Sequence, residues 1–256
     1  MKKCPIKKNE KRSTVVFMKK IPFTMLELLI VIAIIVILAG LLLPALNSVR
    51  KKGQAIKCVN NLSQLMKGHF LYADAQNQWM IGSQANKAGT TTALGWSYFI
   101  VEAFPYVKKQ IIRCGSNPVL PKMLSNATDW SWRCYGMYTP KDRWTGTYYN
   151  DRIDETGDFA VKCEDGTRAF CLTRMKSPSR IFLLADSGSF NDPPGRACNK
   201  FHPTSSVEKD AAIFLLHTNR ANMAFADGHV EARSQSRLRS DGFTRIALEN
   251  GTVLIF

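Results

Sequence analysis

The sequence is poor in acidic residues and lacks the short motifs that usually mark a metal site. Its 256 residues include 20 Asp and Glu against 35 Lys and Arg, which gives a formal net charge of +15. It has seven cysteines but no Cys-x-x-Cys pair, and no cluster of acidic residues at alternating positions. The first absence argues against a common type of zinc site, and the second argues against a calcium-binding loop.

The composition excludes a disordered or collagen-like chain, because 45% of the residues are hydrophobic and 10% are aromatic. The positive charge is unevenly spread. The first 22 residues have eight Lys and Arg against Glu10, a net charge of +7, and the rest of the chain has 27 basic and 19 acidic residues, a net charge of +8. Half of the excess therefore belongs to a short tail, and we expect no nucleic-acid partner.

A long apolar run follows this tail. Residues 25–46 contain one charged residue, Glu27. As a helix, residues 23–46 would be about 36 Å long, which is enough to cross a hydrocarbon core of about 30 Å. A cleavable secretory signal would have a shorter apolar core and a small-x-small site, which this run lacks. We therefore predict a retained, single-pass transmembrane helix over residues 23–46.

The apolar pattern continues beyond the predicted span with helical spacing. Over residues 47–78 apolar side chains recur every three or four positions, which predicts an amphipathic continuation of the same helix, packed on a globular domain at 79–256. The apolar positions are Leu46, Val49, Ile56, Val59, Leu62, Leu65, Met66, Phe70 and Ala73. Basic residues are more numerous before the span than just after it, so we expect a cytoplasmic N-terminus and an exported C-terminal domain.

The start of the apolar run resembles the N-terminal signature of type IV pilins and type II secretion pseudopilins. A basic leader precedes Phe23-Thr24-Met25-Leu26-Glu27, and the aliphatic run that follows contains Gly40 and Pro44. The resemblance implies that a prepilin peptidase removes residues 1–22 and that the new amine of Phe23 is methylated. It also implies a pilin-like lollipop of the α+β class, with a long helix on a small antiparallel sheet. The sequence departs from the family at Pro22, where glycine is usual.

The same resemblance gives roles to residues inside the span. A carboxylate in a spanning helix costs a few kcal/mol of free energy unless it has a partner. The resemblance implies that Glu27 compensates the N-terminal amine of a neighbouring subunit and sets subunit registry; the alternative is an interfacial residue that reaches the headgroups. Gly40 and Pro44 mark a position where the helix can bend during assembly, or a plain membrane kink.

Two segments of the globular part have strand patterns. Residues 179–185 end in Asp186, and residues 222–226 lead into Asp227-Gly228, which is typical of a two-residue type I′ turn, so we predict a hairpin over 222–232. Residues 128–150 contain seven aromatic side chains, which we expect to be core residues rather than a binding surface.

The C-terminal part carries a second resemblance. His217, followed by nine residues and then Asp227-Gly228, is similar to a domain found behind prepilin-type N-termini in large bacterial families. We expect a structural role for His217, Asp227, Gly228 and His229, with His217 hydrogen-bonded between the strand entry and the turn. The alternatives are a metal site made of His217, Asp227 and His229 with the addition of Asp186, and acid/base catalysis.

Six of the seven cysteines follow the leader, and an even number on the exported side favours disulfides. We predict a bridge between Cys58 and Cys114 and a local bridge between Cys163 and Cys171. A zinc site is the alternative use of these cysteines.

Together these observations predict a pseudopilin-like structural subunit of the bacterial inner membrane, with its C-terminal domain in the periplasm or at the cell surface. We expect no enzymatic activity and no cofactor. The expected partners are the prepilin peptidase, other pilin or pseudopilin subunits and the lipid bilayer, in a pilus-like or type II secretion-like apparatus. The alternative is a membrane-tethered periplasmic binding or hydrolytic domain that uses a prepilin-type anchor.

Overall fold

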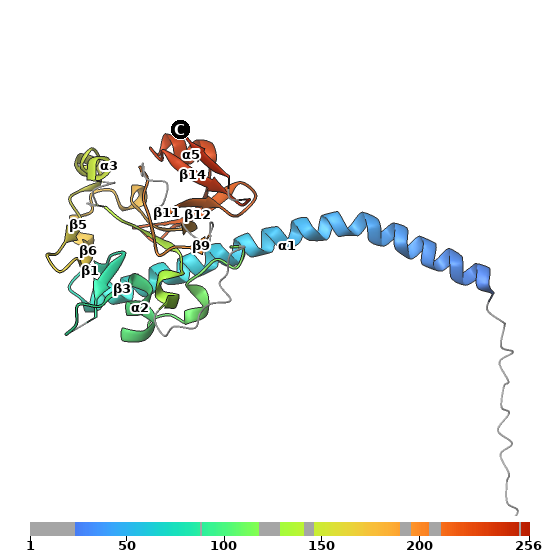
Figure 1. The fold of residues 1–256 in the computed structure, drawn as a ribbon, viewed down its shortest axis with the longest axis horizontal. Helices are drawn as coiled ribbons and strands as arrows, with labels where there is room; N and C mark the ends of the chain where they lie inside the picture. The colour runs from blue at the N-terminus through green and yellow to red at the C-terminus, as the bar shows by residue number, and fades with distance from the viewer. Residues whose placement is uncertain are drawn as a thin grey trace, which may run out of the picture. The chain divides into compact units, whose positions relative to one another are not determined.

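The protein combines one long N-terminal helix with a domain of mixed β-sheets. A computed structural model describes residues 24–87, 89–117, 129–140, 146–189, 196–204, 211–250 and 252–256. The chain divides into two compact units, residues 1–47 and residues 48–256. Helix α1 (Met25–Ala75) begins in the first unit and ends in the second, which contains every described strand (Figure 1). The predicted α+β class is confirmed.

The first half of α1 is apolar and exposed. Each described side chain from Thr24 to Gly53 is exposed, and the helix continues without a break through Gly40 and Pro44. Among the described helices it alone is long and apolar enough to cross a membrane. The first half of α1 therefore has the length and composition of a single membrane span.

The second half of α1 buries one face in the domain. Its buried residues follow each other at helical spacing and are Cys58, Asn61, Leu62, Leu65, Met66, Gly68, His69 and Ala73. Burial follows the predicted stripe from Leu62 onward. Leu46, Val49 and Ile56, which the spacing also placed on the packed face, remain more than 60% exposed because no described element covers them.

Two five-stranded sheets form the centre of the second unit. The strands of the first sheet, in spatial order, are β10 (Lys200–Phe201), β4 (Gly136–Tyr138), β7 (Phe182–Ala185), β12 (Arg220–Phe225) and β13 (Val230–Ser234). Those of the second sheet are β15 (Val253–Ile255), β14 (Arg245–Leu248), β11 (Ala211–Leu215), β8 (Ser187–Ser189) and β9 (Arg196–Ala197). The predicted antiparallel pairing accounts for most strand pairs, but the pairs β10–β4 and β11–β14 are parallel, so both sheets are mixed.

The chain crosses between these sheets at two neighbouring points. Asp186 alone separates β7 in the first sheet from β8 in the second, and residues 216–219 connect β11 in the second sheet to β12 in the first. The backbone of Asp186 bonds to both returning strands: its N–H donates to the carbonyl of Asn222 (3.0 Å), and its carbonyl accepts from the N–H of Phe214 (3.1 Å). The two crossing points are therefore held side by side.

The turn types differ from the prediction. Strands β12 and β13 pair as a hairpin, but at Asp227-Gly228 only Gly228 has a positive φ, of 92°. The N–H of Gly228 donates to the carbonyl of Phe225 (2.9 Å), which closes a three-residue loop that needs positive φ at its last residue only. The predicted two-residue type I′ turn is therefore wrong here. Two successive residues with positive φ occur at Thr218 and Asn219 (53° and 60°), before β12, and at Asn77 and Gln78 (50° and 67°), before β1.

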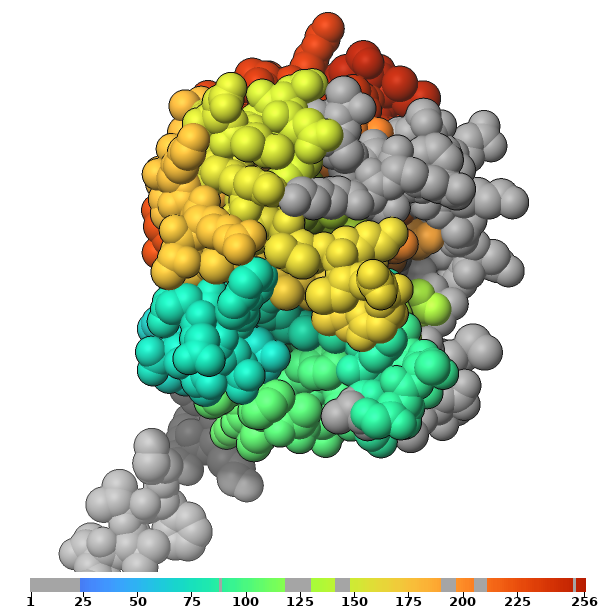
Figure 2. Space-filling view, turned by 90° about the vertical axis from the view of Figure 1, so that its left-hand side faces the viewer, coloured from blue at the N-terminus to red at the C-terminus, as the bar shows by residue number. Residues whose placement is uncertain are grey.

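Smaller elements complete the second unit. Two further sheets contain β1 (Trp79–Ile81), β6 (Arg168–Cys171) and β5 (Ala160–Lys162), and β2 (Gln84–Asn86) and β3 (Ala93–Gly95). The remaining segments are short helices: α2 (Trp96–Tyr98), η1 (Phe99–Ala103), η2 (Lys109–Ile111), η3 (Asp129–Trp132), α3 (Gly146–Asn150), α4 (Ile153–Thr156), η4 (Leu172–Arg174), η5 (Pro178–Arg180) and α5 (Gln235–Ser240). Figure 2 shows one face of the domain, on which the segment of β1 and β2 (cyan) lies beside the segment of β5 and β6 (yellow to orange).

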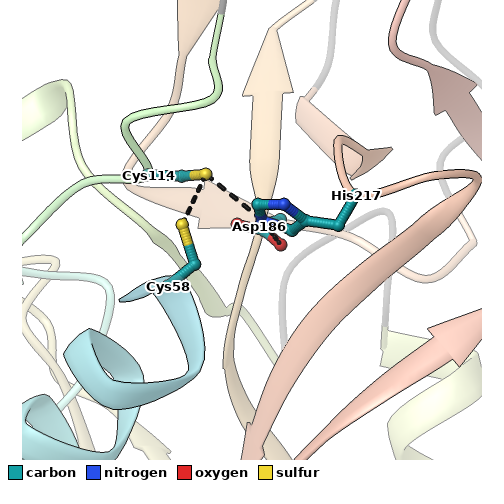
Figure 3. Close-up of side chains that lie close together, drawn as sticks. All are labelled: Cys58, Cys114, Asp186 and His217. Atoms are coloured by element: carbon teal, nitrogen blue, oxygen red, sulfur yellow. Dashed lines mark hydrogen bonds and ion pairs between the residues drawn. The ribbon is translucent and has the colours of Figure 1, made fainter. Parts of the chain in front are cut away.

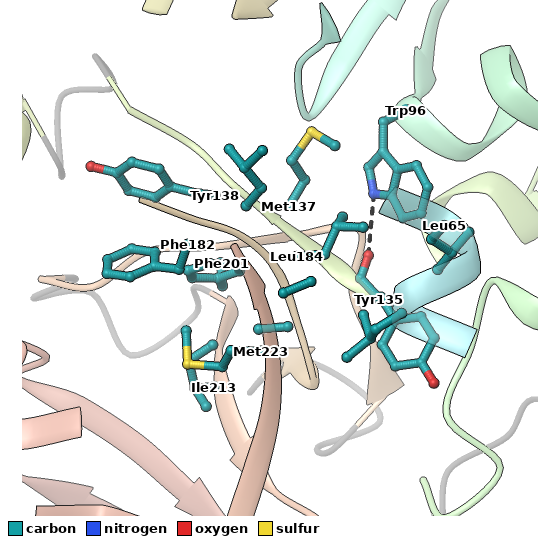
Figure 4. Close-up of a cluster of buried hydrophobic side chains, with 14 of the residues drawn as sticks. Leu65, Trp96, Tyr135, Met137, Tyr138, Phe182, Leu184, Phe201, Ile213 and Met223 are labelled. Atoms are coloured by element: carbon teal, nitrogen blue, oxygen red, sulfur yellow. Dashed lines mark hydrogen bonds between the residues drawn. The ribbon is translucent and has the colours of Figure 1, made fainter. Parts of the chain in front are cut away.

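The core gathers side chains from α1, α2 and both five-stranded sheets (Figure 4). Trp96 is fully buried, and its indole N–H donates to the carbonyls of Tyr135 and Asn199, both at 3.1 Å. Tyr135, Tyr138 and Tyr149 are at most 4% exposed. For these aromatic residues the prediction of a core role is confirmed; Trp144 lies outside the described residues.

His69 on α1 is buried without any hydrogen bond among the described residues, and its ring packs on Trp96 with centroids 5.2 Å apart. Burial lowers the pKa of His69 to about 3. The unfolded chain binds this proton near pH 6.5, so stability is complete above that pH and is lost as the pH falls toward 3.

We predict that His69→Leu removes part of the acid sensitivity of the fold. Between pH 7 and pH 5 the buried neutral ring should cost the wild-type chain about 2 kcal/mol of unfolding free energy, which the variant should not lose. The measurement is the urea midpoint of tryptophan fluorescence at several pH values, on the full chain in detergent. His229→Leu, which changes an exposed histidine, is the control. Equal acid slopes for wild type and His69→Leu would contradict the prediction.

Candidate functional site

The N-terminal motif forms a capping box at the start of α1. The hydroxyl of Thr24 accepts a hydrogen bond from the N–H of Glu27 (3.2 Å), and the Oε2 atom of Glu27 accepts from the N–H and the hydroxyl of Thr24, both at 2.8 Å. We did not foresee this role for Glu27, although Thr-x-x-Glu before an apolar run is its known sequence signal. Pro22 and Phe23 lie outside the described residues.

Four chemically reactive side chains meet in the interior of the second unit. They are Cys58 on α1, Cys114 in the loop after η2, Asp186 between β7 and β8, and His217 between β11 and β12 (Figure 3). All four are buried, and one donor atom from each lies within 4.8 Å of every other. We call these residues the Cys–Asp–His cluster.

The contacts inside the cluster are short. The sulfur atoms of Cys58 and Cys114 lie 2.8 Å apart. The Nε2 atom of His217 lies 3.3 Å from the sulfur of Cys114 and 3.3 Å from Oδ2 of Asp186. The imidazole nitrogen thus faces both a sulfur and a carboxylate oxygen, and Figure 3 shows the two cysteines and His217 approaching from opposite sides.

The surrounding backbone holds the carboxylate and one sulfur in place. Oδ2 of Asp186 accepts a hydrogen bond from the N–H of Asn222 (2.8 Å), and the sulfur of Cys114 accepts one from the N–H of Ser116 (3.4 Å). The other carboxylate oxygen, Oδ1 of Asp186, is buried without a hydrogen-bond partner among the described residues. The phenol oxygen of Tyr135 is also buried without one.

Burial and mutual contact shift the protonation of the cluster. Burial opposes a charge on His217, but hydrogen bonds to Asp186 and Cys58 outweigh it and raise the pKa of the imidazole to about 10. The hydrogen bond with Cys114 lowers the pKa of the Cys58 thiol, and the same bond together with burial raises the pKa of Cys114. Burial raises the pKa of Asp186. Without a bound ion, His217 is therefore the positively charged member near neutral pH.

The structure separates residues that we had grouped at the hairpin. His217 contacts Asp186, whereas His229 pairs with Asp227 at 2.5 Å on the surface, with 40% and 36% of these two side chains exposed. The ring of His229 stacks on Phe225 with centroids 4.2 Å apart. The predicted hydrogen bond from His217 to the turn is wrong, because the tight turn at Thr218-Asn219 directs His217 toward the sheet crossing instead.

The two predicted cysteine pairs have different outcomes. The structure brings Cys58 and Cys114 together across 56 residues, as two free thiols. Cys163 and Cys171 lie toward opposite ends of the β5–β6 hairpin, because the N–H of Cys163 bonds to Thr167 and that of Cys171 bonds to Phe159. Four residues of strand span about 13 Å, which is too far for a disulfide, so the second predicted bridge is wrong.

The cluster is not arranged as a catalytic relay. In such a relay the carboxylate orients one imidazole nitrogen while the other activates the nucleophile. Here Cys114 and Asp186 both contact Nε2 of His217, and Nδ1 is buried without a partner among the described residues. Atoms that converge on one point can instead share a proton, form a disulfide between the sulfurs, or ligate a metal ion.

A surface hollow near α3 and α4 offers no clear ligand site. It is lined by Tyr148, Arg152, Arg180, Arg233 and Asp241, among others. These arginines already have acidic partners: Arg152 (3.7 Å) and Arg180 both pair with Glu155, and Arg233 pairs with Asp241 (3.2 Å). The alternative of a tethered binding domain gains no support from this hollow.

Comparisons with protein-family models, with curated proteins and with solved structures find no match to this chain. The resemblance to pilins and pseudopilins therefore rests on the motif at residues 23–27, on the C-terminal His217 and Asp227-Gly228 pattern, and on a helix and sheet domain compatible with that architecture.

We predict that the buried and exposed histidine–aspartate pairs differ strongly in their contribution to stability. His217→Ala should lower the unfolding free energy by about 3 kcal/mol, because it leaves Asp186 buried without its partner. His229→Ala breaks a pair of the same chemistry at the surface and should cost less than about 1 kcal/mol. Urea unfolding of chelator-treated full chain in detergent measures both. Similar losses in the two variants would show that the Asp186 carboxyl is neutral and needs no partner.

Proposed function

We propose that this protein is a membrane-anchored, pilin-like structural subunit that is cut before Phe23 and assembles through the first half of α1. The observation that carries the proposal is the exposed apolar surface of that helix. Its aliphatic side chains between Met25 and Leu46 are between 47% and 86% exposed. A surface of this size is covered in a cell by lipid, by other copies, or by both in turn.

The charge inside this surface supports assembly as well as anchorage. Both hydrogen bonds from Thr24 go to Oε2 of Glu27, and Oε1 has no partner among the described residues. A carboxylate oxygen left free at the edge of an apolar helix favours a cationic partner. Cleavage before Phe23 would create an amine four residues away on every copy, which supplies such a partner on a neighbouring subunit.

The proposed role is structural rather than catalytic. The Cys–Asp–His cluster is buried, and its geometry does not form a relay between a nucleophile and a base. The second unit would then act as the exported body of the subunit, in a bacterial inner membrane with the N-terminus in the cytoplasm. Its partners would be a prepilin peptidase and other pilin-like subunits.

We predict that the mature protein begins at Phe23. The leader holds the basic residues on the cytoplasmic side, so the Pro22–Phe23 bond lies at the interface, where a membrane peptidase can reach it. Intact-mass and N-terminal peptide analysis of membrane-extracted protein, expressed in a host that has a prepilin peptidase, measures this. Recovery of Met1, or of an N-terminus inside the apolar run, would remove the proposed processing. Pro22→Gly, the residue usual in the resembled family, should be cut at least as completely.

A second prediction separates the two roles of Glu27. Glu27→Gln keeps a side chain that can close the capping box but removes the charge, and Thr24→Ala removes part of the cap but keeps the charge. We expect Glu27→Gln and Glu27→Ala to be cleaved normally and to be lost from cross-linked oligomers, whereas Thr24→Ala enters them. If Glu27→Gln assembles like wild type, the residue serves its own helix and not a neighbouring amine.

A further inference from the structure

The Cys–Asp–His cluster contains the donor set of a closed metal site. Two sulfurs, one imidazole nitrogen and one carboxylate oxygen are the ligands that zinc takes in proteins. Ligand atoms of a tetrahedral zinc site lie about 3.3 to 3.8 Å apart, given metal–ligand bonds of about 2.0 to 2.3 Å. The two contacts of His217 Nε2, to Cys114 and to Asp186, are both 3.3 Å. The sulfurs, at 2.8 Å, would separate by about 1 Å.

The buried carboxyl group of Asp186 is only partly compensated, which favours a cation beside it. Asp186 is 1% exposed, and Oδ1 has no hydrogen-bond partner among the described residues. The only ion pair of Asp186 in the described part of the chain is with His217, which is also a potential ligand. Burying a carboxylate without full compensation is costly. A disulfide between Cys58 and Cys114 would account for the two sulfurs but would bring no second positive charge to the buried Asp186 carboxyl group.

The elements that supply the donors are firmly held. Asp186 and His217 occupy the two points where the chain crosses between sheets, each fixed by backbone hydrogen bonds, and Cys58 lies on the packed face of α1. Ligands on rigid elements from distant parts of a sequence are typical of a site that stabilises a fold.

We propose that Cys58, Cys114, Asp186 and His217 bind one zinc ion, which ties α1 to both five-stranded sheets. Four protein ligands leave no open position, so the ion is structural and not catalytic. Two thiolates and an imidazole favour zinc over calcium or magnesium. The proposal departs from our expectation of a protein without a metal. It does not depend on membrane assembly, because all four ligands lie in the second unit.

The test is metal analysis of the full chain, purified in detergent under reducing conditions, with a sample alkylated at lysis to record the native thiol state. We expect one equivalent of zinc per chain, and we expect the chain to take up cobalt(II) after chelation and dialysis, with the absorption bands of a tetrahedral cobalt–thiolate centre. Chelator should lower the melting temperature. Cys58→Ser and His217→Ala should weaken metal binding at least about 100-fold. The controls, Cys171→Ser and His229→Ala, should bind like wild type.

Three results would overturn the proposal. The first is native protein without zinc that carries a Cys58–Cys114 disulfide, and the second is reduced wild-type protein that takes up neither zinc nor cobalt. The third is equal loss of metal in the Cys171→Ser control. The cobalt–thiolate bands of the wild-type chain decide the question even where a ligand variant fails to fold.

Discussion

Asp186 joins two five-stranded sheets as a single residue, and the rest of the domain is arranged around its buried carboxyl group. A connection this short prevents β7 and β8 from pairing with each other, and the backbone bonds of Asp186 to Asn222 and Phe214 bring the second crossing alongside. The carboxyl group cannot reach water, so it must be compensated from within. His217 at the second crossing is placed where that compensation is needed.

The two halves of α1 differ in what their surfaces contact, although the helix is continuous. From Cys58 to Ala73 the helix buries a stripe in the domain, and Gly68 in that stripe leaves room for the side chain of Val107. From Met25 to Leu46 the helix is exposed on all sides and, apart from Glu27 near its start, apolar on all sides. A stripe suits one partner, whereas an apolar circumference suits lipid or several identical neighbours. The change of pattern therefore marks the change from folding within the chain to contact with its surroundings.

The sequence allowed prediction of features that depend on local pattern. Apolar spacing predicted the helix over nearly its full length, and Asp227-Gly228 indicated the hairpin, because glycine accepts the positive φ that the loop needs. The turn type was predicted wrongly because a two-residue type I′ turn and a three-residue loop can both have glycine at this position. The cluster was predicted only in pieces, as a pair of cysteines and as His217 with Asp186. Two members that are in contact, Cys114 and His217, lie 103 residues apart in the sequence. A periodic pattern cannot connect such positions, because they come together only where the chain crosses between the sheets.

The cluster lies at a point of α1 where it can resist a pulling force on the helix. Cys58 is the first fully buried residue of the helix, so it lies where the packed part of α1 begins. Force transmitted along an anchored helix acts first on the contacts at that point, and apolar contacts there would be lost one turn at a time. A cross-link from Cys58 to Cys114, Asp186 and His217 distributes the load over both sheets at once. A zinc ion would do this through four ligands and a disulfide through two, so the native state of these sulfurs determines how firmly the domain is held to its helix.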